Sequence, residues 1–222
     1  MIKQYGKRLK MLKEACVENF TNVPKVIAEG ANRIELNNDL AAGGTTPSFG
    51  VTKKVVEYAH NLNIPVVVMI RPRAGNFVYT KDEIAIMLSD IEMASLAGAD
   101  GVTFGCIDMN GDLDQENMSK LIQLAHVLDL EVVMHMAFDE IAENQQQNAI
   151  DWLSSKKVKR ILTHGGSLEQ TIFDNYPHLK EIINWAKNKI EILPGGGITA
   201  QNIAKVARDL DVTQMHGTKI VS

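Results

Sequence analysis

Acidic, basic and thiol side chains occupy every second position of two short apolar segments, EACVEN and RIELNN, near the start of the chain. Alternation with a period of two is typical of a β-strand, so one face of each strand would carry all of these groups. Carboxylates can act as general acids or bases, a guanidinium can pair with an anion, and a thiolate can bind a soft metal ion. The groups concerned are Glu14, Cys16, Glu18, Arg33, Glu35 and Asn37.

Further ionisable residues follow apolar runs later in the chain, and they could meet the first set in one pocket. As acid or base candidates we consider Glu18, Glu35, His135 and Asp139. As substrate-binding candidates we consider Arg71, Asn37, His164 and His216. A guanidinium such as that of Arg71 can hold a carboxylate or phosphate through two hydrogen bonds. The alternative is that the Arg, Glu and His side chains form a network that only fills a polar interior.

Two glycine-rich stretches could form binding loops. PGGGIT, residues 194–199, places Gly195, Gly196 and Gly197 before a predicted helix, where bare backbone amides could hold an anion. A simple tight turn is the alternative. AAGGTTPS, residues 41–48, could be a lid or rim, or a plain connection.

Copper(I) prefers thiolate and thioether donors, and the chain has two cysteines and ten methionines. Most methionines fall in helical patterns, which is typical of core residues. The remaining candidate ligands are Cys16, Met69, Cys106 and His135. Since no CxxC or HxxxH spacing occurs, spacing alone does not identify a metal site.

Eight β-branched segments alternate with helical patterns, which predicts parallel strands joined by right-handed crossovers. The strand segments begin at residues 14, 33, 66, 101, 132, 160, 190 and 214. We expect helices over residues 23–29, 51–62, 80–99, 115–128, 145–153, 179–188 and 200–210, with Thr80, Asp114 and Thr199 as N-caps.

The pattern favours an α/β fold with one domain over residues 1–222, a TIM-type (β/α)8 barrel whose eighth helix is missing or very short. A doubly wound sheet is the alternative. Residues 1–10 would be an N-terminal extension. The surface left by the missing helix could be covered by another subunit, so we expect a homo-oligomer.

In a barrel, the alternating residues of a strand face either the lumen or the helices. Because apolar residues such as Ile34 and Leu36 must meet the helices, the polar residues between them should face the lumen. The same argument turns Met69, Arg71 and His135 inward.

Composition narrows the class of partner. Apolar residues make up 45% and charged residues 23% of the chain, which is ordinary for a globular protein. The net charge is −4 and the sequence has no basic stripe. These two features argue against nucleic acid and anionic membranes as partners and favour small ligands. No long apolar run or secretory signal is visible, so we expect a cytoplasmic protein with free thiols.

Several stretches together resemble the CutC family, in order from about Leu12 to Gly217. They are CVEN, NRIELNNDLAAGGTTPS, VMIRPRAGNFVYT, the GDLD turn, HMAFD, RILTHGG, EILPGGGIT with Asn202, and MHG. The resemblance implies a cytoplasmic, often oligomeric TIM barrel with a role in copper homeostasis, and hence binding of copper, as Cu(I), with Cys16 as a ligand.

The chain departs from the family pattern at four places. Asn37 stands where many relatives have a cysteine, which argues against a two-thiol copper site with Cys16. Met136 replaces an arginine, His164 replaces a serine, and the ending HGTK leaves Lys219 as the nearest cation. Two functions therefore stay open: a copper-binding protein, or a barrel enzyme acting on a small anionic, phosphorylated or sugar-like substrate.

Overall fold

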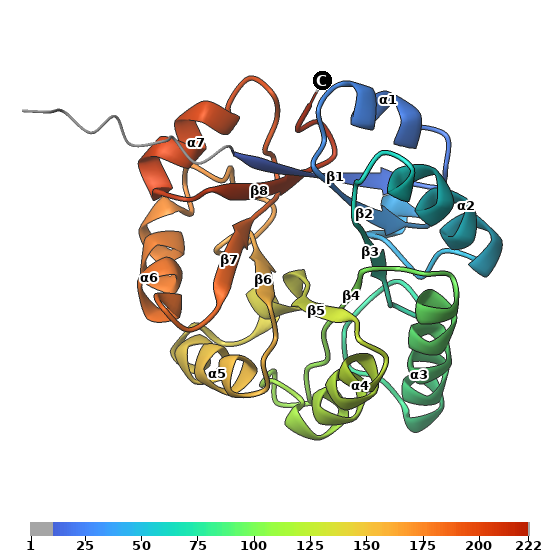
Figure 1. Ribbon diagram of the computed structural model, residues 1–222. Helices are drawn as coiled ribbons and strands as arrows, with labels where there is room; N and C mark the ends of the chain where they lie inside the picture. Colours follow the sequence, from blue (N-terminus) through green and yellow to red (C-terminus); the bar gives the residue numbers. More distant parts are fainter. Residues whose placement is uncertain (1–10, 222) are drawn as a thin grey trace, which may run out of the picture.

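Eight parallel strands form one sheet that curls into a nearly closed barrel (Figure 1). The computed structural model describes residues 11–221, and the predicted extension over residues 1–10 lies outside them. The strands are β1 (Leu12–Glu18), β2 (Arg33–Asn37), β3 (Val66–Met69), β4 (Gly101–Phe104), β5 (Glu131–Met134), β6 (Arg160–Thr163), β7 (Glu191–Pro194) and β8 (Gln214–Gly217). Each strand pairs with the next from β1 to β7, and β8 pairs with β1, which confirms the predicted TIM-type barrel.

Helices surround the strands on the outside (Figure 1). They are α1 (Val23–Ala28), α2 (Phe49–His60), α3 (Lys81–Leu96), α4 (Gln115–Val127), α5 (Glu143–Ser155), α6 (Tyr176–Ala186) and α7 (Ile203–Leu210), with 3-10 turns η1 (Leu40–Ala42) and η2 (Met136–Glu140). Residues 218–221, which follow β8, contain no helix, in agreement with the predicted loss of the eighth one.

Local hydrogen bonds explain where the helices begin. The Thr80 hydroxyl accepts from the Glu83 amide (3.2 Å) and the Glu83 carboxylate accepts from the Thr80 amide (2.7 Å), which forms the predicted capping box of α3. The prediction that Thr199 caps α7 was wrong. Asn202 precedes that helix, and its side chain accepts from the Thr199 amide (2.9 Å) and donates to the Gly197 carbonyl (2.9 Å). The loop after β7 therefore closes on Asn202 before the helix starts.

Alternate residues of each strand separate into two layers, as the parity argument predicts. Ile34 and Leu36 belong to the large core between sheet and helices. Inside the barrel lies a smaller apolar cluster, made of Val67, Val133, Leu162 and Leu193. These four residues come from β3, β5, β6 and β7, whereas the buried residues Cys16, Glu35 and His216 come from β1, β2 and β8.

A belt of paired polar side chains closes the end of the barrel where the strands begin. Arg160 donates to Glu131 (2.7 Å), Gln214 donates to Glu191 (2.8 Å), and Arg33 donates to the side-chain oxygen of Gln214 (3.1 Å). The bond between Gln214 and Glu191 also joins β8 to β7, which no strand ladder connects. These contacts hold Arg33 in place at the end of the barrel, where it also bonds to Glu14.

Candidate functional site

The predicted site residues make three groups of mutual contacts. The first comes from β1, β2 and β8, the second from β3 and β5 with their loops, and the third from η2 and the loops after β6 and β7. Glu18 joins none of them. It is exposed, and its carboxylate accepts from the Leu40 amide (2.7 Å), so it supports the turn after β2.

The first group brings together a thiol, a carboxylate and an imidazole. One donor atom from each of Cys16, Glu35 and His216 lies within 4.8 Å of the other two. The strand register explains this, because Cys16 is opposite Glu35 while Glu14 is opposite both Arg33 and His216. All three residues are buried, with exposed fractions of 8%, 2% and 6% respectively. We call Cys16, Glu35 and His216 the metal triad, because these side chains are suitable metal ligands.

Glu14 orients the imidazole of the metal triad. Its Oε1 lies 2.8 Å from His216 Nδ1, and its other oxygen is bonded to Arg33. His216 Nε2 therefore faces the triad and lies 3.7 Å from Glu35 Oε2. A carboxylate that binds one imidazole nitrogen while the other faces a metal is the usual support of histidine ligands. Sequence reasoning placed Glu14 among the inward-facing polar residues but not among the site candidates, because its partner is 202 residues away and depends on the pairing of β8 with β1.

Burial and charge set the protonation of this group. Burial alone would raise the pKa of Glu14, but the charge of Arg33 and the hydrogen bond from His216 lower it to about 2. Burial would lower the pKa of His216, yet the charge of Glu35 and the contacts with Cys16 and Glu14 raise it well above the ordinary value. Burial and the charge of Glu35 raise the pKa of Cys16 to about 11. The triad thus holds protons at neutral pH that a metal ion would displace.

Asn37 occupies the place next to the triad where a second cysteine was considered. Its side-chain nitrogen donates to Glu35 Oε2 (2.9 Å) and to Cys16 Sγ (3.4 Å). It thereby orients the carboxylate and the thiol, and it also excludes a β-carbon at Gly44, which would lie 2.5 Å from its Oδ1. The structure therefore gives Asn37 a positioning contact with two triad members.

A cavity of about 380 Å³ at the mouth of the barrel, where the strands end, reaches His216 of the triad. His216 lines it together with Met136, Gly196, Gly197 and Lys219. Gly195 lies behind them, and a β-carbon there would come within 2.9 Å of the Met136 methyl group. The absence of a side chain at Gly195 therefore leaves room for the Met136 thioether.

The second group holds Arg71 and His135 against Phe77. The guanidinium carbon of Arg71 lies 4.8 Å from the centroid of the Phe77 ring, and the His135 ring lies 4.9 Å from it. Arg71 donates to the carbonyls of Ala42 (3.1 Å) and Gly44 (2.9 Å), so the glycine loop after β2 is a fixed rim. Sequence reasoning did not single out Phe77, although it lies in the family-like stretch VMIRPRAGNFVYT.

The third group centres on Asp139, which lies in η2. Its carboxylate accepts from the Thr163 hydroxyl and from the amides of His164 (2.9 Å) and Gly165 (3.2 Å). Burial raises its pKa to about 6 in spite of these bonds. The His164 ring bridges two carbonyls, those of Gly195 (2.9 Å) and Gln170 (3.1 Å). Asp139 and His164 thus join the loops after β5, β6 and β7.

Two further candidate ligands, Cys106 and His135, lie outside the metal triad. Cys106 is fully buried in the outer core, its amide contacts Met118 Sδ (3.3 Å), and burial strongly raises its pKa. His135 belongs to the second group. Cys106 is therefore a natural control for thiol chemistry at Cys16.

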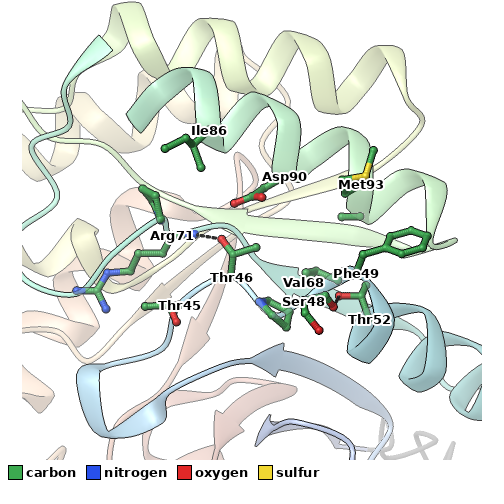
Figure 2. A pocket seen from close by; sticks show the side chains of 13 residues that line it. Thr45, Thr46, Ser48, Phe49, Thr52, Val68, Arg71, Ile86, Asp90 and Met93 are labelled. Atoms are coloured by element: carbon green, nitrogen blue, oxygen red, sulfur yellow. Dashed lines mark hydrogen bonds between the residues drawn. The ribbon is translucent and has the colours of Figure 1, made fainter. Parts of the chain in front are cut away.

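A separate cavity of about 360 Å³ lies outside the barrel, between α2 and α3 (Figure 2). Ser48, Asp90 and Met93 line it, and Arg71 reaches it only near its backbone, where its amide donates to the Thr46 hydroxyl (2.9 Å). Figure 2 shows the guanidinium of Arg71 directed away from Asp90. This cavity is thus distinct from the three groups.

Comparison with known proteins decides the family. The model of the CutC family matches residues 11–221. The chain belongs to the CutC family. A CutC family protein from Enterococcus faecalis is 50% identical over 95% of this chain and 100% of the relative. A human protein named copper homeostasis protein cutC homolog is 37% identical over 92% of this chain and 72% of the relative.

Solved structures agree with this assignment. The crystal structure of CutC from Streptococcus agalactiae superposes with a TM-score of 0.90 at 41% identity, covering 95% of this chain and 99% of that one. Deoxyribose phosphate aldolase from Aeropyrum pernix superposes with a TM-score of 0.70 at 12% identity, covering 94% and 87%, which shows a shared fold only. Among the described residues of this CutC family member, no helix is long and apolar enough to cross a bilayer.

Proposed function

We propose that this CutC family protein binds Cu(I) at the metal triad of Cys16, Glu35 and His216. The observation that carries the proposal is the bond between Glu14 and His216 Nδ1, which directs the free Nε2 to the thiol and the carboxylate. A buried imidazole arranged in this way is preorganised as a ligand. The mouse and human relatives are named copper homeostasis protein cutC homolog, and these names give independent support to the proposal.

Two of the three donors in the metal triad suit Cu(I). Thiolate and imidazole suit Cu(I), whereas the carboxylate of Glu35 is a harder donor that also suits Zn²⁺. Met136 adds a thioether at the wall of the cavity through which an ion would reach His216. Zn²⁺ is therefore the informative competitor in any test of the site.

The direct test is an anaerobic titration of Cu(I) against a chromophoric Cu(I) chelator. We expect one equivalent to bind to the unaltered protein and Cys16→Ser to bind at least about tenfold more weakly, because it lacks the thiolate. Cys106→Ser is the matched control, since that thiol lies in the outer core and should leave the affinity unchanged. Equal affinities of Cys16→Ser and the unaltered protein would refute the site, and preferential binding of Zn²⁺ would refute its assignment to copper.

We propose as a second candidate an enzyme that acts on a small anionic, phosphorylated or sugar-like substrate. It is favoured by Asp139, whose pKa of about 6 suits a general acid or base near neutral pH. In this case Glu35 and His135 would be the other acid or base candidates, whereas Glu18, also considered from the sequence, supports the turn after β2. Product formation from a library of phosphorylated and carboxylated sugars should then occur and be lost in Asp139→Asn. Absence of any product would reject this function.

A further inference from the structure

We propose that Arg71 and His135 form a binding site for a small oxyanion, a carboxylate or a phosphate, at the mouth of the barrel under the ring of Phe77. The site shares no residue with the metal triad, so it goes beyond the proposed copper function. Three observations support it: an uncompensated charge, two buried donors without acceptors, and an apolar floor beneath them.

Arg71 carries a buried positive charge that no carboxylate balances. Its side chain is 6% exposed, and its terminal nitrogens donate only to carbonyls, those of Ala42, Gly44 and Gly75 (2.7 Å for the last). Within residues 11–221, no acidic side chain lies within 4.0 Å of it, although Arg33, Arg73 and Arg160 all have such partners. Burial of an unpaired charge costs free energy because the charge loses its hydration. An anionic ligand would offset that cost more fully than the neutral carbonyls do.

Two buried N–H groups at this place lack acceptors. Arg71 Nε has no hydrogen-bond partner among the described residues, and neither has His135 Nε2. His135 Nδ1 accepts from the Ala137 amide (3.1 Å), so the neutral ring carries its proton on Nε2 and can donate there. Burial and the charge of Arg71 lower the pKa of His135 to about 3, which keeps the ring neutral at physiological pH. An oxyanion would accept from both groups.

The surroundings limit the ligand to a small one. Phe77 contacts both side chains, and it covers them from the loop after β3. Two residues before them, the next inward positions are Met69 on β3 and Val133 on β5, and Val133 belongs to the apolar lumen cluster. The hydroxyl of Thr103 lies at that inner level and is also without a partner. The anionic group would therefore bind between Phe77 and the apolar side chains of Met69 and Val133.

Isothermal titration with inorganic phosphate and, in a separate arm, with malonate tests the proposal and distinguishes the two anions. We expect at least one of them to bind, and His135→Phe to weaken that binding at least about tenfold, because one buried hydrogen bond to a charged ligand is lost. Arg71→Gln should weaken it at least as much. Arg73→Gln is the matched control, because that arginine lies two residues away and is already paired with Glu83. Cys16→Ser should leave the affinity unchanged.

A spectroscopic readout separates binding from loss of structure. The Nε2–H signal of His135 in a ¹H–¹⁵N spectrum, assigned by its absence in His135→Phe, should shift when the anion is added. Arg71 also fixes two loops through its bonds to Ala42, Gly44 and Gly75. A loss of anion affinity in Arg71→Gln is therefore compared only if the variant keeps the far-ultraviolet circular dichroism spectrum of the unaltered protein. His135→Phe retains the loop contacts of Arg71. Absence of heat and of a His135 shift with both anions would overturn the proposal, as would equal binding by His135→Phe.

Discussion

At the scale of single residues, the most informative feature is a chain of buried charges that runs from Arg33 through Glu14 to His216. Each charge has a partner of opposite sign, which is the condition under which buried charges persist. The same chain directs His216 Nε2 toward Cys16 and Glu35. Stability and the geometry of the metal triad therefore depend on one carboxylate.

Removal of that carboxylate should be strongly destabilising. We expect Glu14→Gln to lower the free energy of unfolding at pH 7 by about 3–5 kcal/mol, because the charge of Arg33 is left buried and unpaired. Since the pKa of Glu14 falls from 4.5 to about 2 on folding, its contribution is complete above pH 4.5 and is lost as the pH falls toward 2. Urea denaturation at pH 7 and pH 3 measures this. Glu116→Gln, which alters an exposed ion pair with Lys120, should change little at either pH. A similar loss in both variants would contradict the assignment.

The affinity for Cu(I) should increase with pH. Copper must displace the proton of Cys16, whose pKa is about 11, and that of His216, whose pKa is also raised. Release of one to two protons makes the affinity rise roughly ten- to a hundredfold per pH unit. Chelator competition at pH 6, 7 and 8 gives the slope, and a flat profile would show that these groups are not the ligands.

At the scale of elements, the sequence predicted those features that depend on local pattern. The period-two alternation in β1 and β2 placed Cys16 and Glu35 on the inner face, and the capping box identified the start of α3. The start of α7 was misplaced because Asn202, not Thr199, precedes the helix. The pairing of Glu14 with His216, and the contact of both Arg71 and His135 with Phe77, could not be predicted. They depend on the register and curvature of the closed sheet, which alternation does not encode.

The rim after β2 offers a test of how an element positions the triad. Gly44 has a φ of +86°, and a β-carbon there would lie 2.5 Å from Asn37 Oδ1. We expect Gly44→Ala to destabilise the protein by roughly 1–3 kcal/mol and to displace Asn37, because both the backbone and the contact become strained.

Gly50→Ala is the control for that substitution. Gly50 lies in α2, and nothing within 4 Å would meet an added β-carbon. It should therefore be neutral or slightly stabilising in thermal denaturation. If both variants had the same midpoint, the rim would have no role in holding Asn37.

At the scale of the whole molecule, the barrel is divided into an apolar side and a polar side. Val67, Val133, Leu162 and Leu193 pack together on the side of β3, β5, β6 and β7, while β1, β2 and β8 bring together the ionisable groups of the metal triad. Occupation of the triad would join the first two strands to the last one. A bound ion should therefore stabilise the closure of the whole barrel.

This stabilisation should be measurable by anaerobic calorimetry. At a free Cu(I) concentration about 100 times the dissociation constant, binding adds about 2.7 kcal/mol to the free energy of unfolding. For a chain of this length, the midpoint should rise by roughly 5–11 °C. Cys16→Ser should show no such rise under the same conditions, whereas Cys106→Ser should show it in full. An equal rise in Cys16→Ser would indicate that copper stabilises the protein from elsewhere.

The central claim is that one buried triad binds copper, and the location of the ion tests it most directly. A crystal structure of the Cu(I)-loaded protein, with anomalous data collected on both sides of the copper absorption edge, would give that location. We predict a single strong copper peak bonded to Cys16 Sγ and His216 Nε2, with Glu35 beside it and Glu14 still bonded to His216 Nδ1. A peak at Cys106 or at exposed methionines, with the triad unchanged, would contradict the account.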